Sequence, residues 1–529
     1  MANFPSAART ALLVTVTLLL AACSTLREDF AKPVSQALPP TQETASARYI
    51  DAEREKRAPG ESGFRVLTLS TNALMSRLAL ADRADRSLDL QYYIFENDAT
   101  GQLVALYLLK AADRGVRVRL LLDDITQAEQ APMFDSLDAH ENIEVRLFNP
   151  FNSRVPGLLS KSAQMLLEFR RLNRRMHNKS FIADNRVAIV GGRNIADDYF
   201  DAADTKNFRD LDLLAIGPVV QQASHAFDSY WNDEAAVPVS AFKKGTSEVP
   251  DLAALRAQLQ KNARAFDQSD YAQAALEELP DGATADRRGQ WFWGKAVLLA
   301  DQPEKIEAGD DQAGLRIAPG IDVLLRGAKS QALMMSPYFV PGDSDRNTLV
   351  SLVKAGVDTR ILTNSLASTD QPAVHSGYAA HRRDLLAGGV KLFELKPQAG
   401  AMKTVAQARR ANGVTLHAKS IVIDQRYVFV GSMNMDHRSR LLNTEMGFVV
   451  DSPALAKAVV DYFRVITLPA NSYQLSLEDA DGTASGSGQI LWASEADGVP
   501  VTHTREPGVG PLLRTEVLLM KLLPIDSLL

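Results

Sequence analysis

Two stretches decide the fold: Met176-His-Asn-Lys-Ser-Phe-Ile-Ala-Asp184 and Leu416-His-Ala-Lys-Ser-Ile-Val-Ile-Asp424. Both contain a histidine, a lysine two positions later and an aspartate five positions after the lysine, and they are offset by 240 residues. Each is followed, ten residues after its aspartate, by an asparagine in Gly191-Gly-Arg-Asn194 or Gly431-Ser-Met-Asn434. A period this long indicates a duplicated domain and not a solenoid repeat.

Two further pairs of segments repeat in the same order along the chain. Val116-Arg-Val-Arg-Leu-Leu-Leu122 matches Val357-Asp-Thr-Arg-Ile-Leu-Thr363 at an offset of 241 residues. Val145-Arg-Leu-Phe148 matches Val390-Lys-Leu-Phe393 at an offset of 245 residues. Four matches in one order with nearly constant offsets show that the duplication covers most of the chain.

Strand-like and helix-like patterns alternate in the first copy. Residues 88–95 alternate like a strand, and residues 103–114 have the apolar spacing of a helix. Such alternation is typical of a parallel α/β sheet. We therefore predict two homologous α/β/α lobes, over residues 64–245 and 311–475, related by a pseudo-twofold axis.

The repeated histidines and lysines are the candidate functional residues. Side chains two apart in a strand share a face, so His177 should project with Lys179, and His417 with Lys419. Packing of the lobes about the axis would bring both pairs to one pocket at the interface. The side chains expected there are His177, Lys179, Asn194, His417, Lys419 and Asn434.

This set of side chains suits chemistry at a phosphodiester. Histidine acts as a nucleophile or as a general acid near neutral pH. Two lysines and two amides supply donors for charge that develops on phosphate oxygens. Since fixed cations do this work, we expect no metal and no cofactor. Asp184 and Asp424 fall at turns, which favours a supporting role over contact with substrate.

The two blocks resemble the paired HKD motifs of the phospholipase D superfamily, over about 400 residues that span both lobes. Other stretches are similar, more specifically, to the bacterial cardiolipin synthase C branch. These are Tyr92-Tyr-Ile-Phe-Glu-Asn-Asp-Ala-Thr-Gly101, Asn149-Pro-Phe151, His375-Ser-Gly-Tyr-Ala-Ala-His-Arg-Arg383 and the ending from Glu506-Pro to Leu523-Pro-Ile-Asp-Ser-Leu-Leu529. The resemblance implies two phospholipase D-like lobes with the active site at their interface.

It also implies a metal-independent, two-step transfer of a phosphatidyl group through a phosphohistidine. His177 would be the nucleophile and His417 the acid, later the base, although the symmetry of the sequence equally allows the reverse. Asp210 and Glu445 match the positions that orient the histidines, and we hypothesise that each crosses to the other lobe. The residues that would bind the phosphate are Lys179, Lys419, Asn194 and Asn434. Asp184 and Asp424 complete the motif.

The leading functional hypothesis is a cardiolipin synthase-like phosphatidyltransferase. Its substrates would be phospholipids, with phosphatidylglycerol as the acceptor. The sequence leaves the donor lipid open, with phosphatidylethanolamine as one candidate, and does not reveal whether a partner protein is needed. The alternative is a phospholipase D that uses water. A nuclease is disfavoured by the formal net charge of -6, so we expect no nucleic acid. A non-catalytic envelope lipoprotein is disfavoured because both motifs are intact.

The N-terminus has the pattern of an export signal. An apolar run of about 12 residues, too short to span a membrane, ends in Leu20-Ala-Ala-Cys23. This resembles a bacterial lipobox, so we expect a signal peptide over 1–22 and lipidation of Cys23. Residues 23–63 would form a tether. We expect a lipid-anchored protein of the cell envelope that faces the periplasm, and Ser24 favours the outer membrane.

The remaining segments are less informative. Residues 246–310 predict a helical connector, and 476–529 a C-terminal extension whose apolar Pro511–Leu523 helix either docks on the core or lies on a membrane. The arginines of Phe169-Arg-Arg-Leu-Asn-Arg-Arg175, like Arg409-Arg410, either attract anionic headgroups or lie on a solvated surface. Three aromatic residues at strand ends are either core residues or walls of the lipid site. They are Tyr93, Phe95 and Tyr338.

Overall fold

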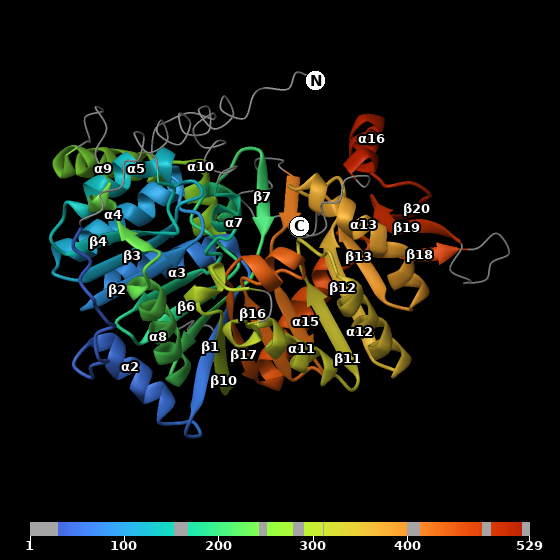
Figure 1. The fold of residues 1–529 in the computed structure, drawn as a ribbon, viewed down its shortest axis with the longest axis horizontal. Coiled ribbons are helices and arrows are strands. Elements are labelled where there is room, and N and C mark those ends of the chain that lie inside the picture. The colour runs from blue at the N-terminus through green and yellow to red at the C-terminus, as the bar shows by residue number, and fades with distance from the viewer. Residues whose placement is uncertain are drawn as a thin grey trace, which may run out of the picture.

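Two α/β lobes lie beside one another in the computed structural model of the chain (Figure 1). The structure describes residues 30–152, 168–242, 251–278, 290–309, 312–398, 413–478 and 488–520. Cys23, the expected signal peptide and Arg409-Arg410 lie outside the described residues.

One mixed sheet of 18 strands, counted over the described residues, runs through both lobes. Its centre is the antiparallel pair of β1 (Glu61–Leu67) and β10 (Phe292–Ala300). Outward from β1 lie β8 (Asp212–Ile216), β6 (Val187–Gly191), β5 (Ser180–Ala183), β2 (Ser87–Tyr92), β3 (Arg117–Asp123), β4 (Ile143–Phe148) and β9 (Ala236–Pro238). Outward from β10 lie β17 (Met446–Asp451), β16 (Tyr427–Gly431), β15 (Ser420–Ile423), β11 (Gln331–Met335), β12 (Asp358–Asn364), β13 (Lys391–Leu395) and β18 (Ser472–Glu478). The two halves have the same order, which confirms the predicted pair of homologous α/β lobes.

Helices pack against this sheet in both lobes (Figure 1). Lobe 1 contains α2 (Ala45–Arg54), α3 (Ser70–Arg83), α4 (Ala99–Asp113), α5 (Gln127–Asp138), α7 (Phe169–Leu172) and α8 (Pro218–Asn232). They are followed by α9 (Leu252–Asp267) and α10 (Asp270–Glu278), and in lobe 2 by α11 (Ala318–Arg326), α12 (Asp343–Lys354), α13 (Pro372–Ala387), α15 (Pro453–Ile466) and α16 (Pro511–Met520). Two short strands, β7 (Lys206–Arg209) and β14 (Gly413–Leu416), pair in parallel outside the main sheet.

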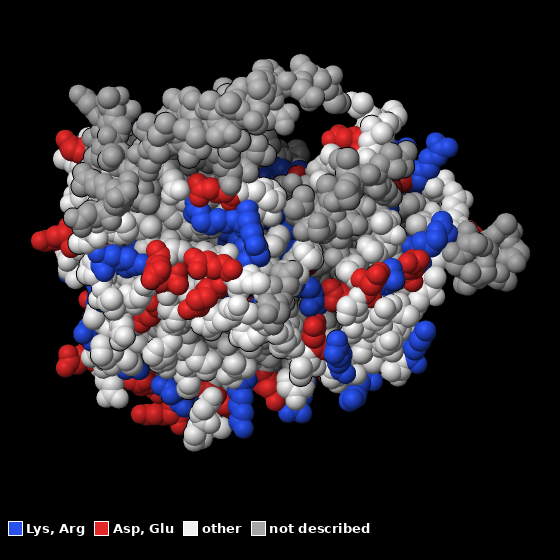
Figure 2. Space-filling model, viewed as in Figure 1, with Lys and Arg blue, Asp and Glu red and all other residues white. Residues whose placement is uncertain are grey.

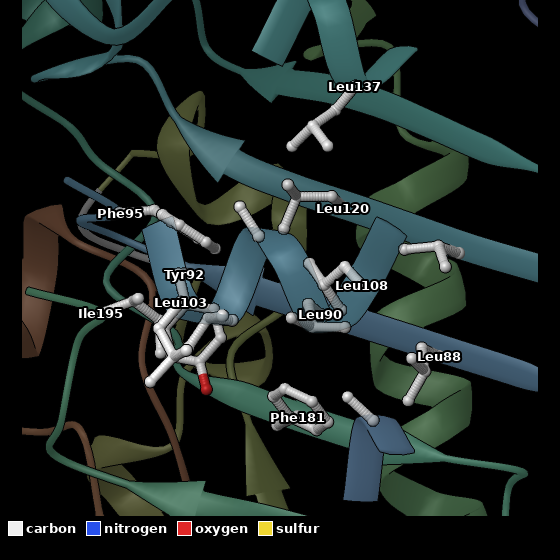
Figure 3. Packing of buried hydrophobic residues seen from close by; sticks show 14 of the residues in the cluster. Leu88, Leu90, Tyr92, Phe95, Leu103, Leu108, Leu120, Leu137, Phe181 and Ile195 are labelled. Carbon is white, nitrogen blue, oxygen red and sulfur yellow. The ribbon is translucent and has the colours of Figure 1, made fainter. Parts of the chain in front are cut away.

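The core of lobe 1 forms where α4 packs on the parallel strands. Leu103 and Leu108 of α4 lie over Leu90 of β2 and Leu120 of β3 (Figure 3). β2 is buried along its whole length, as expected for a strand covered on both faces. This packing fixes the positions of the parallel strands, and β2 pairs directly with β5, the strand of the first motif.

The segment expected to be a tether, 23–63, packs on lobe 1 in its described part. The buried guanidinium of Arg119 donates to the carbonyl oxygen of Ser35 at 3.0 Å, and Arg146 donates to that of Pro33 at 2.7 Å. These contacts use backbone carbonyl oxygens, so they need no apolar side chains. The packing of this segment therefore produces no hydrophobic periodicity that the sequence could show. The expectation of a free tether therefore fails for residues 30–63.

The region expected to be a helical connector, 246–310, contains α9 and α10 but also a central strand. β10 pairs with β1 of lobe 1 and with β17 of lobe 2, so it joins the two halves of the sheet. A short apolar run does not distinguish a strand from a helix by periodicity. The sheet of lobe 2 consequently begins before the expected boundary at residue 311.

The C-terminal extension adds two strands and a helix. The strand expected over 489–493 is β19 (Gln489–Ala496), which pairs with β18 and with β20 (Val499–His503). α16 contacts α13 and buries Val517, yet Leu512 is 83% exposed and Leu519 is 59% exposed. Among the described helices, none has the length and apolar character that crossing a membrane requires.

Candidate active site

Each motif histidine lies just before the first strand of a β-hairpin. His177 and Lys179 precede β5, and His417 and Lys419 precede β15. In both lobes the lysine Nζ donates to the carbonyl oxygen of the histidine two positions earlier, at 2.6 Å. All four residues are buried. The bond folds each lysine back beside its histidine, so the expected pairing of these side chains is present.

The motif aspartates lie at the opposite end of the hairpins. Asp184 accepts backbone N–H groups from Arg86 at 2.8 Å and Ser87 at 3.0 Å, at the start of β2. Asp424 accepts the N–H of Ser330 at 2.7 Å and that of Gln331 at 3.0 Å, at the start of β11. Both aspartates have φ of 53° and begin the turn of their hairpin. These contacts fit the supporting role that their turn positions predict.

Each histidine binds a carboxylate of the other lobe. His177 Nδ1 lies 2.9 Å from Glu445 Oε2, and His417 Nδ1 lies 2.6 Å from Asp210 Oδ2. The crossed pairing that we hypothesised is therefore present. Asp212, the neighbour of Asp210, instead binds two arginines within lobe 1.

Backbone pairing across the lobe boundary positions these contacts. β7 runs parallel to β14, and the N–H of His417 donates to the carbonyl oxygen of Arg209 at 2.7 Å. On the other side Met176 forms a parallel bridge with Thr444, whose carbonyl oxygen accepts the N–H of His177 at 3.0 Å. The residues that follow Arg209 and Thr444 are the two carboxylates, so the direction of the chain brings each to its histidine.

The two halves of the site differ at one matched position, which is Gly192 in lobe 1 and Ser432 in lobe 2. A Cβ atom at Gly192 would lie 2.2 Å from Asp210 Oδ1, so the carboxylate occupies the space of a side chain. Ser432 Oγ donates to Glu445 Oε2 at 2.5 Å. Asp210 is therefore packed closely against Gly192 while its Oδ1 accepts the N–H of Leu211 at 2.7 Å, whereas Glu445 is held by a hydroxyl group.

Burial lowers the pKa of both histidines, because the charged ring loses its hydration. The pKa of His177 lies well below its ordinary value, and the charges of Lys179 and Lys419 act in the same direction. The pKa of His417 falls to about 4, since burial and Lys419 outweigh the opposing effect of Asp210. A neutral ring keeps a lone pair on one nitrogen, as a nucleophile requires.

The partners of the histidines are shifted as well. Burial lowers the pKa of Lys419 to about 8 and that of Lys179 well below its usual value. Burial also raises the pKa of Glu445 to about 7. The pKa of Asp210 falls to about 2, because His417 and Lys419 outweigh the effect of burial. Asp210 is therefore ionised at neutral pH, whereas Glu445 is close to its midpoint.

The two asparagines expected to bind phosphate have different surroundings. Asn194 Oδ1 accepts the N–H of Ile94 at 3.1 Å, and its Nδ2 donates to the Tyr199 hydroxyl at 2.7 Å. Both ends of this amide are thus engaged within lobe 1. The buried Oδ1 of Asn434 has no hydrogen-bond partner among the described residues. Of the two, Asn434 is the better placed to turn its amide toward a ligand.

Aromatic rings flank both histidines. The ring of Tyr93 lies edge-on to His177, with centroids 5.0 Å apart. Tyr199 and Phe208 of lobe 1 lie 5.1 Å and 4.9 Å from the ring of His417. Of the three aromatic residues singled out in the sequence, Tyr93 faces a histidine and Tyr338 lies 6.0 Å from Lys419 Nζ, whereas Phe95 packs in the core.

Sequence reasoning missed Tyr199, Phe208 and Ser432. Comparison of the two motif blocks position by position could have found Ser432, because the matched residue is a glycine.

The arginine-rich run before the first motif is partly structural. Arg175 pairs with Asp123, and Arg174 donates to backbone carbonyl oxygens, so neither is available to attract headgroups.

Comparisons with known proteins agree with this geometry. The family described as "Cardiolipin synthase, PLD-like domain" matches residues 78–231 and 321–467. Cardiolipin synthase C of Escherichia coli (strain K12) is 38% identical over 89% of this chain and 97% of its own length. Cardiolipin synthase 1 of Staphylococcus aureus (strain COL) is 27% identical over 71% of this chain and 61% of its own length. The crystal structure of phosphatidylserine synthase from Haemophilus influenzae Rd KW20 shares the fold, with a TM-score of 0.55 at 13% identity over 91% of this chain and 99% of that one.

Proposed function

The chain belongs to the family of the cardiolipin synthase, PLD-like domain, within the phospholipase D superfamily of enzymes, and we propose that it transfers a phosphatidyl group from one phospholipid to a hydroxyl group of another. The observation that carries this proposal is the pair of buried histidines, each bound at Nδ1 by a carboxylate of the other lobe. A carboxylate at Nδ1 selects the tautomer whose Nε2 is the reacting nitrogen.

In the first proposed step, Nε2 of one histidine attacks the phosphorus of the donor lipid. A P–N bond forms as the P–O bond to the departing headgroup breaks. The second histidine must be an imidazolium at this point, a form that the bound anionic phosphodiester favours, and it gives its Nε2 proton to the departing oxygen, so the headgroup leaves as an alcohol. The phosphatidyl group then remains on the first histidine as a phosphohistidine.

In the second proposed step, the second histidine takes the proton of the acceptor hydroxyl. The acceptor oxygen attacks phosphorus and the P–N bond breaks, which restores both histidines. When the acceptor is phosphatidylglycerol, the product is cardiolipin. When water reaches the intermediate, the product is phosphatidic acid, and the enzyme acts as a phospholipase D.

The asymmetry of the carboxylates supports His177 as the nucleophile and His417 as the acid. An acid must pass through an imidazolium, which the ionised Asp210 stabilises at 2.6 Å. Glu445 has a pKa of about 7 and offers the ring of His177 a weaker negative charge. His177 is thus better suited to remain neutral and attack.

Phosphate binding is assigned to the two motif lysines and to Asn434. Lys179 and Lys419 are buried beside the histidines, where a cation is poorly hydrated. An anionic phosphodiester would favour the charged form of both lysines and so raise their pKa. Charge that develops on the phosphate oxygens would then be stabilised without a metal.

Phospholipids are the proposed substrates, with phosphatidylglycerol as acceptor and phosphatidylglycerol or phosphatidylethanolamine as donor. The 38% identical relative of Escherichia coli is named as a cardiolipin synthase. Acidic and basic side chains are intermixed on the face shown in Figure 2, and the formal net charge of the chain is -6. Neither feature favours a polyanion such as a nucleic acid as the substrate.

We also propose that the chain is held at the periplasmic side of a bacterial envelope membrane by lipidated Cys23, with α16 against the lipid surface. The lipobox-like sequence supports the anchor, and the exposed Leu512 and Leu519 support the contact of α16. Mass spectrometry of the mature protein, with Cys23→Ala as the comparison, tests the anchor. An unacylated N-terminus in the unchanged protein would rule the anchor out.

The transferase proposal is tested with the full chain in vesicles of phosphatidylglycerol, with and without phosphatidylethanolamine. Lipids are resolved by mass spectrometry for the unchanged protein and for His177→Ala. His140→Ala is the matched control, because His140 pairs with Asp113 on the surface of lobe 1. Cardiolipin that requires His177 but not His140 would support transfer. Phosphatidic acid alone would show hydrolysis, and no change in any lipid would refute phospholipid substrates under these conditions.

A further inference from the structure

A cavity of about 590 Å³ lies in lobe 1 between α2, α3, β1 and the β5–β6 hairpin. This volume falls within the range of roughly 300–1,000 Å³ typical of sites for small ligands. Asp184, at the turn of the hairpin, lines the cavity. Because His177 lies before the other end of β5, the cavity is separate from the histidine centre.

One side of the cavity is apolar. Ile50 of α2, Val187 of β6 and Ile216 of β8 form a buried cluster, against which Leu80 of α3 packs. All four side chains also line the cavity. Such a surface excludes water and suits a hydrocarbon chain, since burial of each methylene group is favourable.

The other side of the cavity presents Arg65, a cation without a carboxylate partner among the described residues. Its guanidinium lies over the ring of Trp291 at 4.2 Å and has a side-chain hydrogen bond with Tyr49, whereas its Nε is buried without a hydrogen-bond partner in the described part of the chain. Burial lowers the pKa of Arg65, with Tyr49 and Glu53 opposing the shift. A guanidinium that lines a cavity and has no carboxylate partner within it would be stabilised by an anion bound there.

The charges around Arg65 favour an anion. Arg83 and Arg186 also line the cavity, and Arg186 pairs with Asp51 at 2.8 Å. Two aspartates, Asp85 and Asp184, also line the cavity, and Asp184 is already saturated by backbone N–H groups, so the three arginines outnumber the acidic residues of the lining. The cavity therefore combines an apolar wall with a positively charged end.

We propose that this cavity binds a single-chain anionic amphiphile, with its carboxylate or phosphate head on Arg65 and its acyl chain against Ile50, Leu80 and Val187. A planar guanidinium suits either head through paired N–H donors. Trp291 supports the guanidinium from its other face. The site is independent of the reaction proposed for the histidines.

The experiment measures quenching of tryptophan fluorescence by lipids that carry bromine on the acyl chain. The protein is the full chain with His177→Ala, so that no lipid is turned over. Dibromostearate and dibromostearoyl lysophosphatidate are titrated separately, which distinguishes a free fatty acid from a lysophospholipid. Methyl dibromostearate is the neutral control. We expect saturable quenching by at least one of the two anions, and none by the methyl ester.

Four variants assign the quenching to the cavity. Trp291→Phe should reduce the quenching to what the neighbouring Trp293, 6.3 Å away, still contributes. Arg65→Gln should weaken binding about tenfold or more, and Arg65→Lys should restore part of the affinity. Ala79→Phe should block the chain by filling the cavity, since Ala79 is one of its lining residues. Arg57→Gln is the matched control, because Arg57 lies over Trp293 at 5.1 Å but does not line the cavity.

Two results would overturn the proposal. Arg65→Gln could bind the brominated anions as tightly as the protein with Arg65, while its circular dichroism spectrum is unaltered. That result would exclude Arg65 as the head-binding group. Quenching that is undiminished in Trp291→Phe, or that the methyl ester reproduces, would show only partition of lipid onto the protein surface.

Discussion

Asp210 Oδ2 lies 2.6 Å from His417 Nδ1, although the two residues belong to different lobes. The contact follows from the parallel pairing of β7 with β14, which bonds the N–H of His417 to the carbonyl oxygen of Arg209. The backbone pairing of β7 with β14 therefore fixes the position of Asp210. A variant that alters only the charge of this carboxylate should therefore separate its electrostatic effect from its place in the fold.

We expect Asp210→Asn to lower the turnover number about 100- to 10,000-fold, the range associated with general acid–base catalysis. Asparagine keeps the shape of the side chain but provides no charge for an imidazolium on His417. Turnover on phosphatidylglycerol vesicles and thermal unfolding are measured together. Asp228→Asn is the control, because it removes a charge from an ion pair with Arg119 in lobe 1. Unchanged turnover in Asp210→Asn would contradict the role of this carboxylate.

Gly192→Ala should reduce turnover by a steric route. The new Cβ would lie 2.2 Å from Asp210 Oδ1, so the carboxylate would have to move away from His417. Gly342→Ala is the matched control, since no atom lies within 4 Å of the Cβ it would add. Steady-state kinetics of both variants give the comparison. Full activity of Gly192→Ala would mean that the close approach of Asp210 is not required.

The sequence predicted the two lobes and the motif residues, because the duplication repeats them in the same order. The turn positions of Asp184 and Asp424 likewise predicted support, and both accept backbone N–H groups. These features follow from short-range order along the chain combined with the pseudo-twofold relation. Asp210 and Glu445 were instead implied by the family resemblance, and their crossing to the other lobe was a hypothesis.

Other features could not be predicted for physical reasons. Tyr199 and Phe208 approach His417 only because lobe 1 pairs with lobe 2 through β7 and β14, and no period in the sequence records that contact. The backbone carbonyl oxygens of Pro33 and Ser35 bind buried arginines, which composition does not reveal. An amide such as Asn194 gives no sign in the sequence of whether its partners are ligand or protein.

A phosphatidyl donor with an acidic leaving group should show which of the two histidines is the nucleophile. Phosphatidyl p-nitrophenol releases a phenolate that needs no proton, so His417→Ala should still form the intermediate. We expect a burst of about one equivalent of nitrophenolate and a phosphatidyl adduct on the peptide that contains His177. His177→Ala should give neither. The opposite pattern would reverse the two roles, and no burst in either variant would rule out a phosphohistidine.

The pH dependence of kcat/KM should report the titration of Lys419. Its pKa is about 8, and the protonated form binds the phosphate, so kcat/KM for the donor should fall as the pH rises through about 8. In the complex, the anionic phosphate raises this pKa, so the fall in kcat should occur at higher pH. Lys419→Arg should move the fall in kcat/KM to higher pH, because arginine does not titrate there. An unmoved profile would assign the fall to another group.

The position of α16 leads to a prediction about lipid surfaces. Glu506, just before α16, binds both His375 and Arg382 of α13. A Cβ atom at Gly508 would lie 3.1 Å from that of Ala367, in the loop that follows β12. The same loop accepts hydrogen bonds from Lys206 of β7, the strand that leads to Asp210. α16 is therefore joined through packed residues to the elements that carry the histidine centre.

Replacement of Leu512 and Leu519 together by aspartate should lower kcat/KM on phosphatidylglycerol vesicles about tenfold, because each leucine would otherwise bury apolar surface in the bilayer. Activity on monomeric short-chain phosphatidylglycerol should stay unchanged, since the histidine centre is untouched. Val323→Asp is the matched control, because Val323 is 74% exposed on α11, a helix distant in sequence from α16. Equal losses on vesicles and on monomeric lipid would indicate damage to the fold, and no loss on vesicles would place α16 away from the membrane.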